Sequence, residues 1–91
     1  MNEPMPQTLN SRNRAILASL FEKPTRVDIR WADIVTLITA LGGTVTCKSG
    51  SHHRLSLNGE IGIAARPHPQ PTVARHTVKA VAEFLRKARV A

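Results

Sequence analysis

The chain has few aromatic residues, a single cysteine and few acidic groups, and each scarcity narrows what it can be. Its 91 residues include two Phe, one Trp and no Tyr, so the core of this single small domain is expected to be aliphatic. Cys47 is the only cysteine, which excludes an internal disulfide and gives no sign of secretion. No apolar run reaches the length of a membrane span, and residues 1–7 lack the apolar centre of a signal peptide. We therefore expect a cytoplasmic protein.

Acidic residues are outnumbered by basic ones. Six Asp and Glu stand against 13 Lys and Arg, which gives a net charge of +7 and an isoelectric point near 11.2. Residues 48–91 carry eight of these cations and only two acids, whereas residues 1–30 carry five cations and three acids. A basic half-chain of this kind is typical of proteins that bind a polyanion. The alternative is a basic surface that has no partner.

The spacing of apolar residues predicts three helices. Residues 1–9 are expected to be disordered, and Asn10 or Ser11 to cap a helix that runs to about Phe21. A second helix is expected from about Arg30 to the glycine pair at 42–43, with a third at about 75–88. The predicted core faces of these helices consist of apolar residues at helical spacing: Ile16, Leu17, Leu20, Phe21, Trp31, Ile34, Val35, Ile38, Leu41, Val78, Val81, Ala82 and Leu85.

Between the second and third helices the apolar period becomes two, which predicts three strands at about 44–48, 54–57 and 61–64. Asn58-Gly59 is typical of a two-residue type I′ hairpin turn. Alternation places one set of side chains against the helices: Val45, Cys47, Leu55, Leu57, Ile61 and Ile63. The sequence therefore predicts an α+β fold of order α-α-β-β-β-α, a three-stranded antiparallel sheet with helices on one face. Residues 10–29 form an N-terminal helix and connector in this scheme, and residues 30–91 form the main domain.

The clearest chemical signal is the run Gly50-Ser51-His52-His53-Arg54, which is followed downstream by Pro67-His68-Pro69. A histidine at the edge of a flexible turn can both take and give a proton near neutral pH. Strand alternation puts His52 on the outer side with Arg54, and we expect Lys48 and Arg66 to join them there. His53 has the opposite orientation and is expected to lie against the scaffold. An imidazole among cations suggests an anionic substrate, with RNA cleavage as the first hypothesis.

These motifs, together with His76-Thr77-Val78-Lys79-Ala80-Val81, resemble the HicA family of bacterial toxins from about residue 31 to 90. The resemblance implies an mRNA interferase of a toxin–antitoxin system that acts in stress response, with a fold like a double-stranded-RNA-binding domain. It also implies neutralisation by a HicB-like antitoxin, and it makes the first histidine after Gly-Ser, His52, the catalytic residue. The other expected RNA contacts are cations and one hydroxyl: Lys48, Ser51, Arg54, Arg66 and Lys79. No cofactor, metal or small-molecule ligand is expected.

Several alternatives stay open. His68 is a candidate second proton-transfer group or phosphate contact, or a loop residue that two prolines hold rigid. A metal site of Cys47, His52, His53 and His68 is disfavoured because adjacent strand residues point to opposite faces. The stretch 14–21 could lie on a membrane surface, but packing on the core or on a partner is preferred. The alternative functions are an RNA-binding module without cleavage and a subunit whose basic surface docks an acidic protein.

Overall fold

The computed structural model describes residues 9–90. Its elements are α1 (Ser11–Ser19), α2 (Trp31–Ala40), β1 (Thr44–Ser49), β2 (His52–Leu57), β3 (Glu60–Ala65) and α3 (Arg75–Lys87). This order confirms the α+β arrangement expected from the sequence. Within the described residues, no helix is long and apolar enough to cross a membrane.

The sheet is an antiparallel meander with the strand order β1-β2-β3. Val45 pairs with Leu55, which in turn pairs with Gly62. The turn between β2 and β3 has positive φ at both central residues, 52° at Asn58 and 84° at Gly59. A type I′ turn requires these values, so the predicted hairpin is confirmed.

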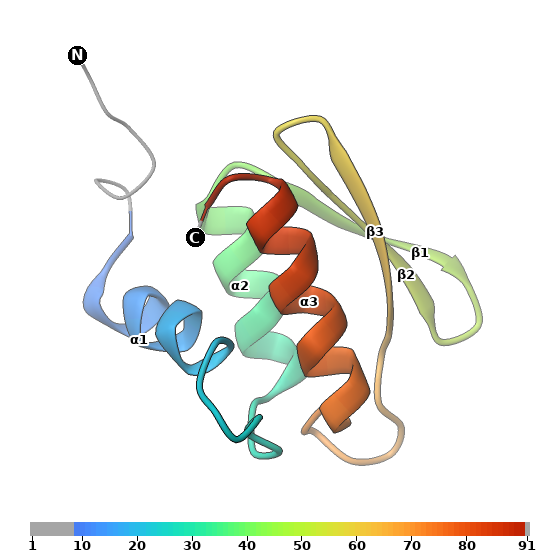
Figure 1. Cartoon of the computed structure of the whole chain (residues 1–91). Coiled ribbons are helices and arrows are strands. Elements are labelled where there is room, and N and C mark those ends of the chain that lie inside the picture. The colour runs from blue at the N-terminus through green and yellow to red at the C-terminus, as the bar shows by residue number, and fades with distance from the viewer. Residues whose placement is uncertain (1–8, 91) are drawn as a thin grey trace.

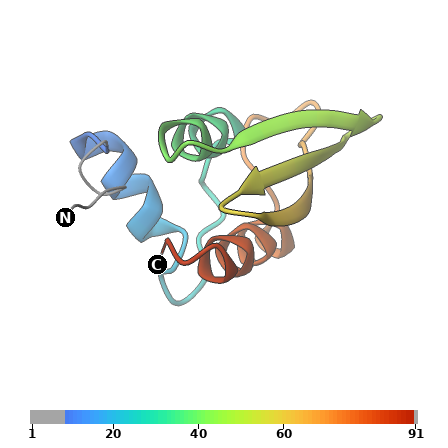
Figure 2. The same cartoon turned by 90° about the horizontal axis from the view of Figure 1, so that it is seen from above.

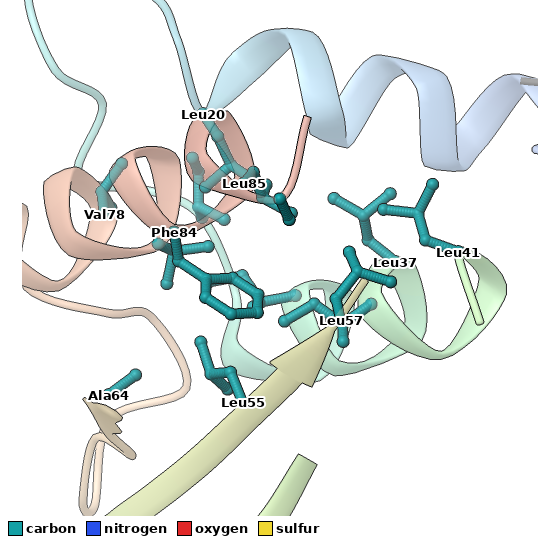
Figure 3. Packing of buried hydrophobic residues seen from close by; sticks show 14 of the residues in the cluster. Leu20, Leu37, Leu41, Leu55, Leu57, Ala64, Val78, Phe84 and Leu85 are labelled. Carbon is teal, nitrogen blue, oxygen red and sulfur yellow. The ribbon is translucent and has the colours of Figure 1, made fainter. Parts of the chain in front are cut away.

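Helices α2 and α3 lie side by side on one face of the sheet (Figures 1 and 2), with α2 against β1 and α3 against β3. No helix of residues 9–90 lies on the other face of the sheet. The core between the layers consists of aliphatic side chains from both helices and from β2, and Phe84 is the aromatic residue at its centre (Figure 3). The most deeply buried of these side chains are Ile34, Leu37, Ile38, Leu55, Val78, Val81 and Leu85. The predicted helix faces are thus largely confirmed, with Leu37 as an additional member.

Helix α1 packs against α2 and completes the same core. The side chain of Asn10 accepts a hydrogen bond of 2.8 Å from the backbone N–H of Asn13, which confirms the expected N-cap. Leu20, just beyond the helix, is only 3% exposed and belongs to the core cluster. The disorder expected for residues 1–9 concerns mainly residues 1–8, which lie outside the described part. For Leu9 the prediction is wrong, because its side chain is buried in the core.

The predicted orientation of β3 is also wrong. Ile61 and Ile63 are 58% and 44% exposed, and Ala64 is buried instead. The reason is the close approach of α3: a Cβ atom at Gly62 would lie only 2.8 Å from Cδ1 of Phe84. There is no room for isoleucine on this side of the strand, so the small residues face the helices and the isoleucines face outward.

Candidate nucleic-acid interface

The turn that precedes the paired histidines combines a left-handed glycine with a bulge. Gly50 has a φ of 53°, a conformation that glycine adopts without steric cost. The pairing of β1 with β2 shifts between Cys47 and Ser49, which leaves Lys48 without a partner across the ladder. Lys48, Gly50 and Ser51 are all exposed. The turn thus projects beyond the sheet, and the next strand, β2, begins directly after it at His52.

Strand alternation with the buried Leu55 places His52 and Arg54 on the outer face of the sheet, the face on which no helix of residues 9–90 lies. They alternate along β2 with His53 and with the buried Leu55. Across the ladder, Arg54 lies opposite Ile63, and both side chains are exposed. The strand geometry therefore places the side chains of His52 and Arg54 on one exposed surface, as the sequence predicted. The outward isoleucines add an apolar component to this surface that the sequence did not lead us to expect.

His53 lies on the helix face, as expected, and its ring is held in place. The ring contacts Trp31 edge-on, with centroids 5.3 Å apart and an interplanar angle of 68°. Its Nδ1 atom lies 3.1 Å from the carbonyl oxygen of Ser51. Since a carbonyl oxygen can only accept a hydrogen bond, Nδ1 carries the proton in this contact. The sequence predicted that Trp31 lies on the core face of its helix. Its contact with His53, a residue of another element, could not be predicted from the neighbouring sequence.

Arg66 does not join the outer face. The expectation rested on an outward Gly62 and Ala64, and these residues face the helices. The backbone N–H of Arg66 instead donates a 2.8 Å hydrogen bond to the carbonyl of Ser51, next to the one from His53. Arg66 lines a hollow together with His53, His68 and the turn residues 50–51. The single surface expected from the sequence is thus divided into two regions on either side of the sheet.

Lys79 is remote from both regions. It lies on α3 and lines a groove with Phe21, Glu83 and the segment that connects α1 to α2. Helix α3 packs on the helix-covered face of the sheet (Figure 1), whereas the side chain of His52 belongs to the opposite face. The structure therefore does not bring Lys79 together with the other predicted RNA contacts. His76 is exposed near the start of α3.

The acidic residues that the structure describes are mostly engaged away from the histidines. Asp33 pairs with Arg12, Glu83 pairs with Arg86, and Arg26 pairs with both Glu22 and Asp28. Hydrogen bonding from Arg26 lowers the pKa of the exposed Asp28 carboxyl. Within residues 9–90, the side chains of Arg54 and Arg66 form no ion pair, so positive charge remains uncompensated at the histidine end of the sheet.

Comparison with known proteins finds a matching family model. Residues 31–90 match a family model described as the HicA toxin of bacterial toxin–antitoxin systems. The match spans α2, the whole sheet and α3, and α1 lies outside it. Neither the curated proteins nor the solved structures include a match to the chain.

Proposed function

Because the chain belongs to the HicA toxin family of bacterial toxin–antitoxin systems, we propose that it is a ribonuclease that cleaves mRNA through His52. The observation that carries this proposal is the exposed imidazole of His52 at the start of β2, on the same open face as Arg54, which forms no ion pair with residues 9–90. An extended polyanion can reach this face without any rearrangement of the core. Family membership also means that an antitoxin is the partner of this protein.

The proposed chemistry uses the nucleophile that RNA itself carries. The imidazole of His52 takes the proton of a ribose 2′-hydroxyl, and the 2′ oxygen attacks the adjacent phosphorus in line with the leaving 5′ oxygen. The bond from phosphorus to the 5′ oxygen breaks, a 2′,3′-cyclic phosphate forms, and solvent supplies a proton to the leaving oxygen. The guanidinium of Arg54 stabilises the negative charge that develops on the phosphoryl oxygens. No step in this scheme requires a metal ion.

The antitoxin that we propose is a HicB-like protein with an acidic surface. Complementary charge accelerates association, and carboxylates can occupy the places where phosphates would bind. The outer face offers cationic and apolar contacts together, because Ile61 and Ile63 lie exposed beside Arg54. In this proposal the complex covers His52 and stops cleavage.

The test is the substitution His52→Ala, with His76→Ala as the matched control on the exposed start of α3. We expect His52→Ala to lower the rate of cleavage of a single-stranded RNA by about 10²–10⁴-fold, the usual worth of general acid–base catalysis, and to relieve growth inhibition. The fold should be retained because the side chain is exposed. The control should cleave at the wild-type rate. Excess EDTA should not slow the reaction, and RNA with a 2′-deoxyribose at the cleaved position should stay intact.

A second candidate function, RNA binding without cleavage, has one structural observation in its favour. His52 is not among the residues that line the hollow at this end of the sheet, and it lies on an open face instead. Binding through phosphates needs cations but no proton-transfer group. If the wild-type protein binds RNA and never cleaves it, or if His52→Ala cleaves as fast as the wild type, catalysis by His52 is refuted.

A further inference from the structure

The hollow on the helix side of the sheet has the features of a second anion site. Its volume is about 380 Å³, and it lies where the β1–β2 turn meets the loop after β3. The lining residues are Cys47, Gly50, Ser51, His53, Arg66 and His68. They include two imidazoles and a guanidinium but no carboxylate. A hollow of this size with these polar and cationic side chains suits a small anionic group better than an apolar ligand.

Backbone hydrogen bonds fix the geometry of the hollow. The carbonyl of Ser51 accepts one hydrogen bond from the Arg66 N–H at 2.8 Å and one from His53 Nδ1 at 3.1 Å. The first ties the loop after β3 to the turn, and the second sets the tautomer of the imidazole. Edge-on packing on Trp31 restricts the ring further. With Nδ1 engaged, Nε2 of His53 is the atom that is left to contact a ligand, and it donates to a phosphate oxygen in the imidazolium form, in which both ring nitrogens carry a proton.

The charge of the hollow is not neutralised from within the described chain. The four salt bridges among residues 9–90 all lie elsewhere, and none of them involves Arg66. Glu60, which forms none of these pairs, stands opposite Leu57 at the far end of the β2–β3 ladder. A guanidinium with free donors matches the oxygens of a phosphate group in a bidentate manner.

A second depression adjoins the hollow on the side of α2. Its volume is about 240 Å³, and it shares Arg66 and His68 with the first and extends to Arg30 and Trp31 at the start of α2. Cationic side chains therefore follow one another along a path from the turn to α2. A path of this kind fits successive charged groups on a chain better than a single free anion.

We propose that this hollow, formed by His53, Arg66 and His68, binds a phosphate group of the RNA strand other than the one that is cleaved. The inference rests on the proposed ribonuclease function and extends it, because it assigns a binding subsite on the face opposite the catalytic histidine. The strand then passes around the Gly50-Ser51 turn, with one phosphate at His52 and a neighbouring stretch in the hollow. Arg66 and His68 are binding residues in this arrangement, and neither takes part in the chemistry.

The first experiment uses inorganic phosphate as the probe and the full chain as the protein. Carbon–proton NMR spectra of the histidine rings are recorded during a phosphate titration at constant ionic strength, for the wild type, Arg66→Ala and Arg54→Ala. We expect saturable shifts of the His53 and His68 signals, with an affinity that falls about tenfold in Arg66→Ala, the worth of one charge-assisted hydrogen bond. At the His53 and His68 signals, Arg54→Ala should titrate like the wild type, because this arginine does not line the hollow.

Ring signals that do not move, or an equal loss of affinity in both arginine variants, would overturn the proposal. This readout does not depend on cleavage. If phosphate binds as expected but the protein cleaves no RNA, the hollow stands as an anion site and the ribonuclease function fails.

The second experiment identifies the source of the phosphate. For RNA cleavage, Arg66→Ala should raise KM about tenfold with kcat close to that of the wild type, because a remote phosphate contact supports binding in the ground and transition states alike. If KM is unchanged while phosphate still binds in the hollow, the RNA assignment is wrong, and an acidic group of the antitoxin is the occupant instead. Circular dichroism of Arg66→Ala should match the wild type, since the backbone hydrogen bond to Ser51 survives the substitution.

Discussion

Helix α1 and its C-cap Leu20 lie outside the segment that matches the toxin family, yet this part of the chain contributes to the core, and the substitution Leu20→Ala tests this role. Leu20 is 3% exposed and belongs to the core cluster. Truncating a buried leucine to alanine costs about 2–5 kcal/mol through lost burial and the cavity left behind. The total stability of a small domain is roughly 5–15 kcal/mol. The substitution should therefore remove a large share of it and lower Tm by roughly 8 °C or more.

The matched control is Leu17→Ala on the same segment. Leu17 is half-buried and lines an open hollow with Arg14, Phe21 and Arg86, so its truncation should cost less than about 1.5 kcal/mol. Urea denaturation followed by circular dichroism measures both variants, and an unchanged m-value shows that only stability has changed. A Leu20→Ala variant within about 0.5 kcal/mol of the wild type would refute the view that α1 belongs to the core. If α1 does not belong to the core, deletion of residues 1–22 should give a soluble, folded protein. If α1 does belong to the core, the truncated protein should aggregate.

Three further predictions concern packing, binding and control. Gly62→Ala should destabilise the protein by about 1–3 kcal/mol in the same denaturation assay, because the new methyl group would meet the buried ring of Phe84 at 2.8 Å; a neutral effect would show that the ring can yield. RNA affinity should fall steeply as the salt concentration rises. Arg54→Ala should reduce the slope of log K against log salt by about one unit, whereas Lys79→Ala should leave this slope unchanged. Equal slopes for the two variants would contradict the placement of the RNA interface on the outer face. An acidic antitoxin should protect the ring of His52 from solvent in an NMR accessibility measurement, and continued exposure in the complex would contradict its proposed mode of inhibition.

The helices and the hairpin were predictable because their signals are local. The cap at Asn10, the glycines after α2 and the Asn58-Gly59 turn each act within a few residues of the structure that they determine. The pairing of His52 with Arg54 on one face follows equally from alternation within a single strand. These parts of the fold and of the site needed no information from distant segments.

The orientation of β3 was not predictable in this way, because it depends on a residue from another element. Alternation in 61–64 is equally consistent with either face inward, and the larger side chains were expected to be buried. Phe84 reverses this choice by occupying the space over Gly62. The error then carried over to Arg66, whose predicted position rested on the orientation of β3. The bulge at Lys48 and the contact of His53 with Trp31 likewise arise from pairing and packing between elements.

Because cationic groups lie on both faces of the sheet, an inhibitor must cover both faces to stop all binding of RNA. A partner that covers only the outer face blocks His52 and Arg54, but it leaves the hollow at Arg66 and His68 open to phosphate. Such a complex would no longer cleave RNA and would still hold it weakly, with the salt dependence of the contacts that remain. A partner that also reaches around the Gly50-Ser51 turn would abolish both. The salt slope of RNA binding by the toxin–antitoxin complex therefore distinguishes these two modes of inhibition, because only the first leaves a measurable slope.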